Sequence, residues 1–277
     1  MTASSKTAAR YTANNAFLPY KIPKNVFAET VTQIQHYTNR LFKFRITRPA
    51  NFRFRSGEFV MIGLPNAEKP IYRAYSIASP FWDVELEFFS IKIADGPFTE
   101  HLQRIKIDDI VLMRTKSTGT LLLDALLPGK RLYLLSTGTG IAPFASLVRD
   151  PETYEKFQQI ILIQTTRETA ELAYANELVT ELRRDPLIGE LSNQLTFYPM
   201  TTREQSNHMG RITDAMRSGQ FFLDTGLPPI NAGEDRMMIC GSIPMLKDCA
   251  NMVKAFGLEE GANNAPATYV VERAFVS

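Results

Sequence analysis

Two different hydrophobic patterns divide the chain near residue 128. In the first part, Phe42, Phe44 and Ile46 alternate with Lys43 and Arg45, which is typical of a strand with one buried face. Further strands are predicted at 58–64, 73–79, 85–93 and 109–113, and a short helix at 98–105. Turn residues separate these segments. Many short strands joined by turns predict a small antiparallel β-barrel.

After Pro128 and Gly129, strands alternate with helices. Strands are predicted at 131–135, 160–164, 195–199, 237–240 and 268–271, and helices at 172–182 and 244–257. This alternation predicts a parallel sheet with right-handed crossovers. We therefore divide the chain into a flexible N-terminal arm (1–28), a barrel domain (29–127) and an α/β domain (128–277). The arm is basic and free of acidic residues, and we interpret it as a solvated segment rather than an organelle presequence.

Composition narrows the class of protein. The 277 residues are 44% hydrophobic and carry a net charge of +2, which predicts a soluble globular protein and does not favour nucleic-acid binding. No apolar run approaches the roughly 20 residues that a membrane helix needs. Cys240 and Cys249 form no CxxC pair, which excludes an iron–sulfur cluster or a cysteine zinc site and favours a reducing compartment, the cytoplasm. The three histidines lie far apart in sequence, so no metal site is predicted.

Candidate binding residues follow four strands of the predicted parallel sheet. They are STGTGIAP (136–143), TTR (165–167), TTRE (201–204) and CGS (240–242). Ligands of an open parallel sheet bind beyond the carboxyl ends of its strands, so this coincidence predicts a nucleotide site. The glycine loop matches neither GxGxxG nor a P-loop. Taken alone, Gly138 and Gly140 are as consistent with a tight strand–helix turn as with phosphate binding.

Arg167 and Arg203 each follow a threonine at a strand end. Arginine binds phosphate oxygens through its forked guanidinium, so the pair predicts selection of a nucleotide with a 2′-phosphate. The alternative is that both are ordinary solvated arginines. Cys240 lies at the same edge and is a candidate contact for a nicotinamide ring, although a buried cysteine is normally a small hydrophobic residue.

The segment RAYSIASP (73–80) suits a second cofactor. Arg73 can neutralise a pyrophosphate, Tyr75 can stack on a planar ring, and Ser76 can donate to or accept from a ring nitrogen. That set suits FAD. Strand alternation puts Arg73 and Tyr75 on one face and Ser76 on the other. A plain strand with a structural tyrosine and a surface arginine remains the alternative.

Several motifs together resemble the ferredoxin–NADP(H) reductase family, and its bacterial ferredoxin/flavodoxin members most. They are RAYSIASP, EFFSIKIADGPFT (87–99), GTGIAPF (138–144), CGS (240–242) and ERAFVS (272–277), and the likeness runs from about residue 28 to the end. The resemblance implies a six-stranded antiparallel FAD barrel followed by an NADP-binding α/β domain. It also implies an enzyme that moves a hydride from NADPH to flavin and then single electrons to ferredoxin or flavodoxin.

The resemblance also implies roles for individual residues. Ser76, Cys240 and Phe275 would be catalytic, with Phe275 covering the flavin face that the nicotinamide must reach. Glu272 is not expected to replace the acid of plastid members, because it stands one position further from the aromatic residue. The residues implied for FAD are Arg73, Ala74, Tyr75, Ser76, Ser90, Ile91, Lys92, Gly96, Pro97 and Thr99, with Ala274 and Phe275 over the ring. Those implied for NADP(H) are Thr137, Gly138, Thr139, Gly140, Arg167, Thr202, Arg203, Cys240 and Gly241.

The electron acceptor is expected to be an acidic ferredoxin or flavodoxin, bound by a monomer. Arg45, Arg48, Arg53 and Arg55 form a basic stretch that would steer such a partner, although surface solubility explains these charges equally well. The residues alone leave two alternative functions open. One is the reductase component of an oxygenase or a free-flavin reductase, and the other is a non-catalytic FAD-binding redox sensor.

Overall fold

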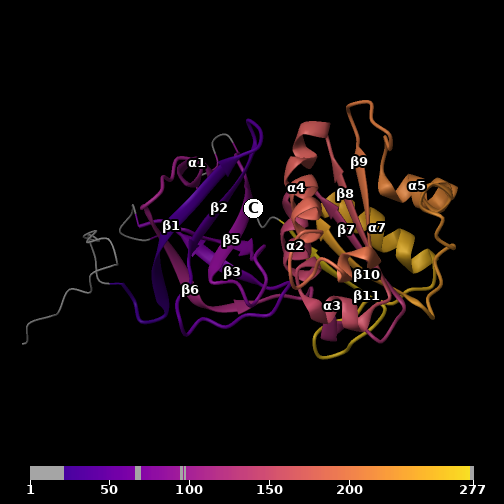
Figure 1. Ribbon diagram of the computed structural model, residues 1–277, viewed down its shortest axis with the longest axis horizontal. Coiled ribbons are helices and arrows are strands. Elements are labelled where there is room, and N and C mark those ends of the chain that lie inside the picture. Colours follow the sequence, from indigo (N-terminus) through magenta and orange to yellow (C-terminus); the bar gives the residue numbers. More distant parts are fainter. Residues whose placement is uncertain (1–21, 66–69, 94–95, 97, 275–277) are drawn as a thin grey trace, which may run out of the picture.

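The computed structural model describes residues 22–65, 70–93, 96 and 98–274, and it contains two sheets side by side (Figure 1). The first is antiparallel, with the strand order β4-β3-β6-β1-β2-β5. Its elements are β1 (Val26–His36), β2 (Leu41–Thr47), β3 (Phe59–Gly63), β4 (Tyr72–Ser76), β5 (Glu85–Ile91), α1 (Thr99–Leu102) and β6 (Ile110–Thr118). The predicted six-stranded antiparallel domain is confirmed.

The sheet closes into a barrel because its two edge strands meet just beyond β4. Ile77 forms an antiparallel bridge with Phe88, and the Ala78 amide donates to the carbonyl of Glu87 at 2.8 Å. Phe42, Phe44 and Phe88 fill the interior and are fully buried. β1 begins at Val26, three residues before the start that we predicted for the barrel. The helix predicted at 98–105 is shorter, because only Thr99–Leu102 is helical.

The polar face of β2 differs from its prediction. Alternation of Lys43 and Arg45 with aromatic residues predicts a face open to solvent, yet Lys43 is only 5% exposed. The reason is tertiary: this face packs against the second domain, where Lys43 Nζ donates to Glu177 Oε1 at 2.5 Å. Sequence periodicity separates the two faces of a strand but cannot tell water from a polar partner surface.

The second sheet is parallel, with the strand order β11-β10-β7-β8-β9. Helices α2 and α4 cover the side that faces the barrel, and α5 and α7 lie on the far side (Figure 1). Short 3₁₀ segments η1 (Leu123–Ala125), η2 (Gly138–Ile141), η3 (Thr169–Leu172) and η4 (Leu191–Gln194) lie between these elements. The strands are β7 (Arg131–Thr137), β8 (Gln159–Thr166), β9 (Leu195–Thr201), β10 (Asp235–Gly241) and β11 (Tyr269–Arg273). The helices are α2 (Ala142–Val148), α3 (Pro151–Lys156), α4 (Ala173–Leu182), α5 (Ile212–Ser218), α6 (Gln220–Thr225) and α7 (Ile243–Ala255).

Local sequence explains the ends of the long helix α7. Pro244 stands in its first turn, where a missing amide hydrogen costs no helical bond. Gly257 follows the helix with φ +82°, the left-handed conformation that stops a helix and favours glycine. No helix of the described residues is long and apolar enough to cross a membrane.

Candidate active site

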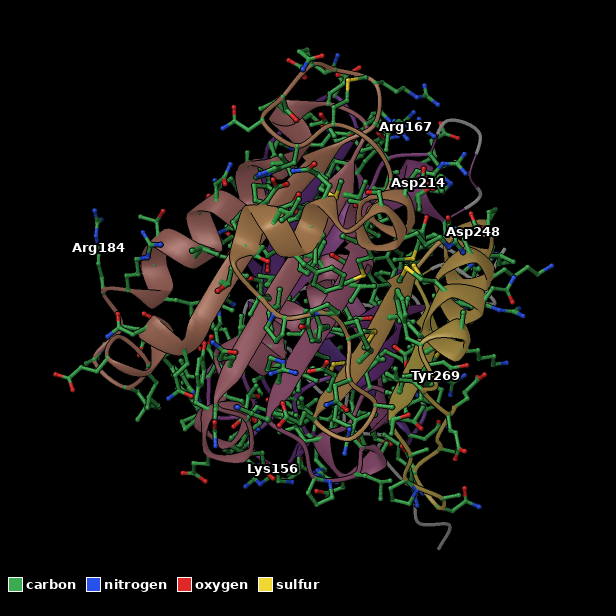
Figure 2. All side chains as sticks on the ribbon, turned by 90° about the vertical axis from the view of Figure 1, so that its right-hand side faces the viewer. Lys156, Arg167, Arg184, Asp214, Asp248 and Tyr269 are labelled. Carbon is green, nitrogen blue, oxygen red and sulfur yellow. The ribbon has the colours of Figure 1, made fainter. Side chains whose placement is uncertain are left out.

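The carboxyl ends of the parallel strands form one edge of the second sheet. β7, β8, β9 and β10 are neighbours in parallel register, so the four predicted segments come together as expected. A cavity of about 220 Å³ lies at this edge. Its lining includes Thr137, Thr165, Thr202, Arg211 and Ser242, which come from all four strand ends and from the loop before α5. Figure 2 labels Arg167, Asp214 and Asp248 near this edge of the domain.

The glycines of the loop have two different roles. A side chain on Gly140 would lie well inside van der Waals distance of the Cys240 carbonyl, so glycine is needed there for packing against β10. Gly138 has φ +54°, and a Cβ atom there would meet nothing within 4 Å. Its backbone therefore faces open space and can be approached by a ligand. The structure shows the tight-turn interpretation at Gly140, whereas phosphate binding at Gly138 stays a prediction.

The two predicted arginine loops run side by side. The Arg203 amide donates to the Arg167 carbonyl at 3.0 Å, and the Thr202 amide donates to the Thr166 carbonyl at 2.9 Å. Glu171 accepts from the Arg167 amide at 2.9 Å, which fixes the loop without using the guanidinium. Neither guanidinium bonds to a residue within the described part of the chain. Both side chains are therefore available to an anion.

Two buried polar atoms at this edge have no hydrogen-bond partner among the described residues. Thr165 Oγ1 is buried and makes no hydrogen bond within the described residues, and the same holds for Gln164 Oε1. Buried polar groups nearly always have hydrogen-bond partners, so a polar ligand at this edge would supply the missing partners of these two atoms. The donor set and the open glycine suit a dinucleotide phosphate.

Sequence reasoning missed Arg211. It lines the cavity, is exposed, and lies 3.7 Å from Asp248 Oδ2. Arg211 follows no strand directly, so the strand-end rule does not reach it. The loop brings it back to the edge, because the Gly210 amide donates to the Thr201 carbonyl at 2.8 Å. A cation immediately before a helix, a few residues after Arg203, is the signal that could have found it.

The predicted flavin residues of β4 and β5 meet in the barrel. Tyr75 Oη and Ser90 Oγ are 3.1 Å apart, and the Tyr75 ring packs edge-on against Phe44 and Phe88. Burial raises the pKa of Tyr75 to about 12, so its phenol is neutral at physiological pH. The described partner of the Arg73 guanidinium is only the neighbouring Tyr72 carbonyl, at 3.1 Å. Arg73 is therefore free to bind an anion, which fits a pyrophosphate.

The predicted pyrophosphate loop is only partly described. Gly96 stands where any side chain would collide with Thr99 Oγ1, so the turn into α1 needs glycine. The Thr99 hydroxyl donates to the Ile93 carbonyl at 3.3 Å. Lys92 is anchored through its amide, which donates to the Arg40 carbonyl at 2.6 Å. Pro97 lies outside the described residues.

The two half-sites meet at the junction of the domains. The amide of Ile77, next to Ser76, donates to the Glu58 carbonyl at 3.0 Å. Gly119 lies between the backbone of Glu58 and the carboxylate of Glu272. Glu272 in turn pairs with Cys240 in the register of β10 and β11. The segments that carry Ser76 and Cys240 therefore both border this junction, whereas Phe275, the third catalytic candidate, lies outside the described residues.

Comparison with known proteins agrees with this geometry. Residues 28–121 match the family model for an oxidoreductase FAD-binding domain, and residues 134–251 match that for an oxidoreductase NAD-binding domain. A flavodoxin/ferredoxin–NADP reductase of Rhodobacter capsulatus is 57% identical over 90% of this chain and 93% of its own. The chain belongs to the ferredoxin–NADP reductase family.

Other members of the ferredoxin–NADP reductase family support the assignment. A ferredoxin–NADP reductase of Pseudomonas aeruginosa is 48% identical, over 91% of this chain and 98% of its own. The solved structure of a ferredoxin NADP+ reductase from Neisseria gonorrhoeae, with bound FAD and NADP, superposes with a TM-score of 0.83. It is 28% identical and covers 91% of this chain and 100% of that one. The chain is thus an oxidoreductase with an FAD-binding and an NAD(P)-binding domain.

The thiol of Cys240 lies inside the second domain of this reductase. Its side chain is fully buried, and burial, with Glu272 beside it, raises the pKa of the thiol well above its usual value. The thiol is therefore protonated at physiological pH and is neither a base nor a nucleophile. Ala274, which would precede the covering aromatic residue, is held because its amide donates to the Gly241 carbonyl at 3.1 Å.

Glu272 fastens β11 to the barrel. Its Oε2 accepts from the Thr120 amide at 2.9 Å, and the Thr120 hydroxyl donates to the Val271 carbonyl at 2.8 Å. Burial raises the pKa of Glu272 to about 7, against the opposing effect of the hydrogen bonds from Thr120. The carboxyl group thus titrates near neutral pH at the junction of the two domains.

Replacing Glu272 by glutamine should flatten the dependence of stability on pH. Because the pKa is raised from 4.5 to about 7 on folding, the stabilisation by the protonated group is complete below pH 4.5 and is lost as the pH rises through 7. Between pH 5 and pH 8 the unfolding free energy of the parent should therefore fall by up to about 3 kcal/mol relative to Glu272→Gln. Urea unfolding across that range measures the difference, and parallel curves would contradict the assignment.

Proposed function

We propose that this protein transfers reducing equivalents from NADPH through bound FAD to a ferredoxin or flavodoxin. The observation that carries the proposal is the junction of the domains, where Ile77, next to Ser76, bonds to Glu58, and Gly119 lies between Glu58 and Glu272, which is in register with Cys240. Family membership supports it, because relatives at 47% to 57% identity are named as such reductases. When bound, FAD accepts a hydride and releases electrons one at a time.

The residues of the chain bind and orient the two cofactors. Tyr75 stacks on the flavin ring, Ser76 bonds near its reactive nitrogen, and Arg73 neutralises its pyrophosphate. Ser90, Ile91, Lys92, Gly96 and Thr99 contribute further contacts to FAD. None of these side chains has to act as a strong acid or base, which agrees with the neutral states of Tyr75 and Cys240.

The nucleotide edge selects NADP(H) over NAD(H). Gly138 and Thr137 offer backbone and hydroxyl groups to the pyrophosphate, while Arg167, Arg203 and Arg211 supply three cations for the 2′-phosphate. Two of these cations have no partner within the described residues, so binding does not require an existing ion pair to break. Thr202, next to Arg203 in the chain, lines the same cavity as Arg211.

The partner proposed here is an acidic carrier that binds the monomer in the cytoplasm. Free, buried cysteines agree with a reducing compartment. The basic stretch 45–55 contributes less to steering than its sequence suggests. Arg45 bonds to Asp83 and Glu85, Arg55 bonds to Asp124, and Arg48 donates to backbone carbonyls. Within that stretch, only Arg53 is exposed without a carboxylate partner among the described residues.

Anaerobic titration of the purified protein with NADPH and then NADH tests the proposal. We expect the visible flavin band to bleach at a far lower concentration of NADPH than of NADH, and the reduced protein to be reoxidised by ferredoxin or flavodoxin. A yellow protein that neither nucleotide bleaches would indicate a redox sensor. A reduced protein that passes electrons only to free flavin would indicate a flavin reductase.

A further inference from the structure

The two faces of strand β5 contact different parts of the molecule: one faces the barrel interior and the other faces the second domain. Ser90 and Phe88 point into the barrel beside Tyr75. On the opposite face, the Phe89 ring stacks on Tyr174 of the second domain, with centroids 4.3 Å apart. Glu87 lies on this second face and is 2% exposed. One strand therefore connects the predicted flavin residues Tyr75 and Ser90 to the face of the barrel that packs against the second domain.

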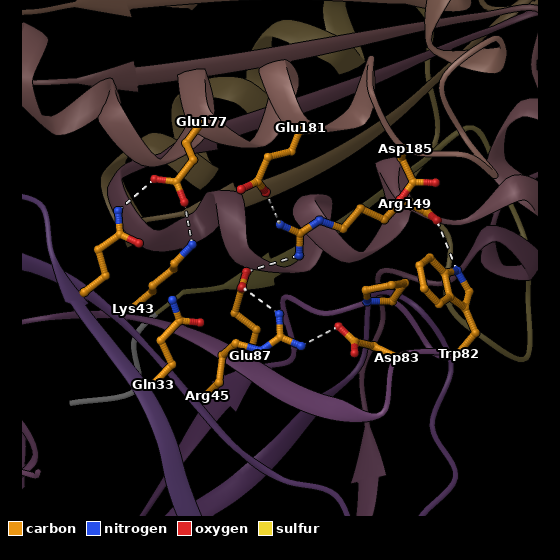
Figure 3. A pocket seen from close by; sticks show the side chains of 12 residues that line it. Gln33, Lys43, Arg45, Trp82, Asp83, Glu87, Arg149, Glu177, Glu181 and Asp185 are labelled. Atoms are coloured by element: carbon orange, nitrogen blue, oxygen red, sulfur yellow. Dashed lines mark hydrogen bonds and ion pairs between the residues drawn. The ribbon is translucent and has the colours of Figure 1, made fainter. Parts of the chain in front are cut away.

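Glu87 lies at the centre of the contact between the domains, and three groups surround it; Figure 3 shows two of them, Arg149 and Arg45. Its Oε1 accepts from Arg149 Nη1 at 3.1 Å and from Tyr174 Oη at 2.9 Å, while Arg45 Nη1 lies 3.7 Å from Oε2. Burial alone would raise the pKa of Glu87, but Arg149, Lys43, Tyr174 and Arg45 together lower it below its usual value. The carboxylate is therefore charged and buried.

The partners of Glu87 belong to the helices that follow the nucleotide loops. Arg149 ends α2, which begins directly after the glycine loop at 138–141. Tyr174 lies in the first turn of α4, a few residues after Arg167. A displacement at Glu87 therefore moves the pyrophosphate loop and the 2′-phosphate loop together relative to the barrel.

Apolar packing and polar bonds both hold the domains together near Glu87. Phe89 and Ala78 of the barrel belong to one buried cluster with Phe144 and Tyr174 of the second domain. Beside this cluster lies a cavity of about 280 Å³, lined by charged side chains of both domains, including Lys43, Arg45, Arg149 and Glu181 (Figure 3). Apolar contact brings the two surfaces together, and directional bonds to the buried carboxylate of Glu87 add a preferred orientation.

We infer that Glu87 is a positioning residue, which sets the approach of the nicotinamide to the flavin by holding Arg149 and Tyr174. The predicted effect on hydride transfer rests on the proposed function. The contacts of Glu87 with Arg149 and Tyr174 are independent of it. Misplacement of reacting groups by about 1 Å can cost about 100-fold in rate, so a small rotation of the domain is enough to be measured.

The experiment compares Glu87→Gln with Glu152→Gln, a surface glutamate of α3 paired only with Lys156 within the described chain. With saturating NADPH in a stopped-flow instrument, we expect Glu87→Gln to bleach the flavin about 10- to 100-fold more slowly and Glu152→Gln to match the parent. FAD content and the affinity for 2′-phospho-AMP, which each report one domain, should not change. Normal bleaching by Glu87→Gln would overturn the inference.

Two further measurements separate positioning from simple loss of folding. Tyr174→Phe removes one bond to Glu87 but keeps the ring on Phe89, and it should slow bleaching a few-fold while its FAD content and its affinity for 2′-phospho-AMP stay those of the parent. Amide hydrogen exchange of the FAD-loaded proteins without nucleotide should be faster in β5 and in the first turn of α4 for Glu87→Gln than for Glu152→Gln. Unchanged exchange in both segments would overturn the inference even if the parent reacts with NADPH. A parent that does not react would instead overturn the proposed function.

Discussion

Replacing Arg203 by alanine should raise the dissociation constant for NADPH about 10- to 100-fold, because a charge-assisted contact with the 2′-phosphate contributes about 1.5–3 kcal/mol. The affinity for NADH, which lacks that phosphate, should change less than about twofold. The fold should not suffer, because the guanidinium makes no bond within the described residues. Titration of the flavin band with each nucleotide gives both constants.

Arg184→Ala is the matched control. Arg184 is an exposed arginine of the same domain, and Figure 2 shows it on a different side from Arg167. It should leave both dissociation constants unchanged. That result would show that loss of one positive charge anywhere on the domain does not by itself weaken the binding of NADPH. Equal weakening of NADPH and NADH by Arg203→Ala would mean that this residue does not recognise the 2′-phosphate.

The arrangement of the nucleotide edge of the parallel sheet could be predicted from sequence because it follows from the strand topology. Once strands alternate with helices, their carboxyl ends share one edge, so Thr137, Thr202 and Cys240 fall together without knowledge of any contact. Arg211 was not predicted because it reaches the edge through a returning loop, where no rule about strand ends applies. The barrel was predictable for a similar reason, since short strands with period-two alternation allow few other arrangements.

The contacts between the domains were not predictable in the same way. Lys43, Arg45 and Glu87 follow the pattern of a solvated strand face, and hydrophobicity gives the same pattern whether water or a charged helix covers them. Their partners are far away in sequence: Glu177 lies 134 residues after Lys43. Only the fold brings such pairs together, and the same holds for the pairing of Glu272 with Thr120 across the junction.

Arg73→Ala should yield a protein that folds but loses FAD on purification. The guanidinium donates only to the neighbouring Tyr72 carbonyl within the described residues, so its removal breaks no tertiary contact of the barrel. Loss of one charge-assisted contact to the pyrophosphate should raise the dissociation constant for FAD about 10- to 100-fold. Fluorescence titration of the apoprotein with FAD measures this constant, since the free cofactor emits and the bound one is quenched by a stacked aromatic ring.

Arg53→Ala is the control for Arg73→Ala, because Arg53 is an exposed arginine of the barrel that, like the half-buried Arg73, donates only to nearby backbone carbonyls, in its case those of Ala50 and Phe52. It should bind FAD like the parent. A variant at Arg73 that keeps its FAD would mean that the pyrophosphate lies elsewhere, and RAYSIASP would then be an ordinary strand with a surface arginine. If Arg73→Ala loses FAD while its 2′-phospho-AMP affinity is normal, the barrel and the α/β domain bind their cofactors independently.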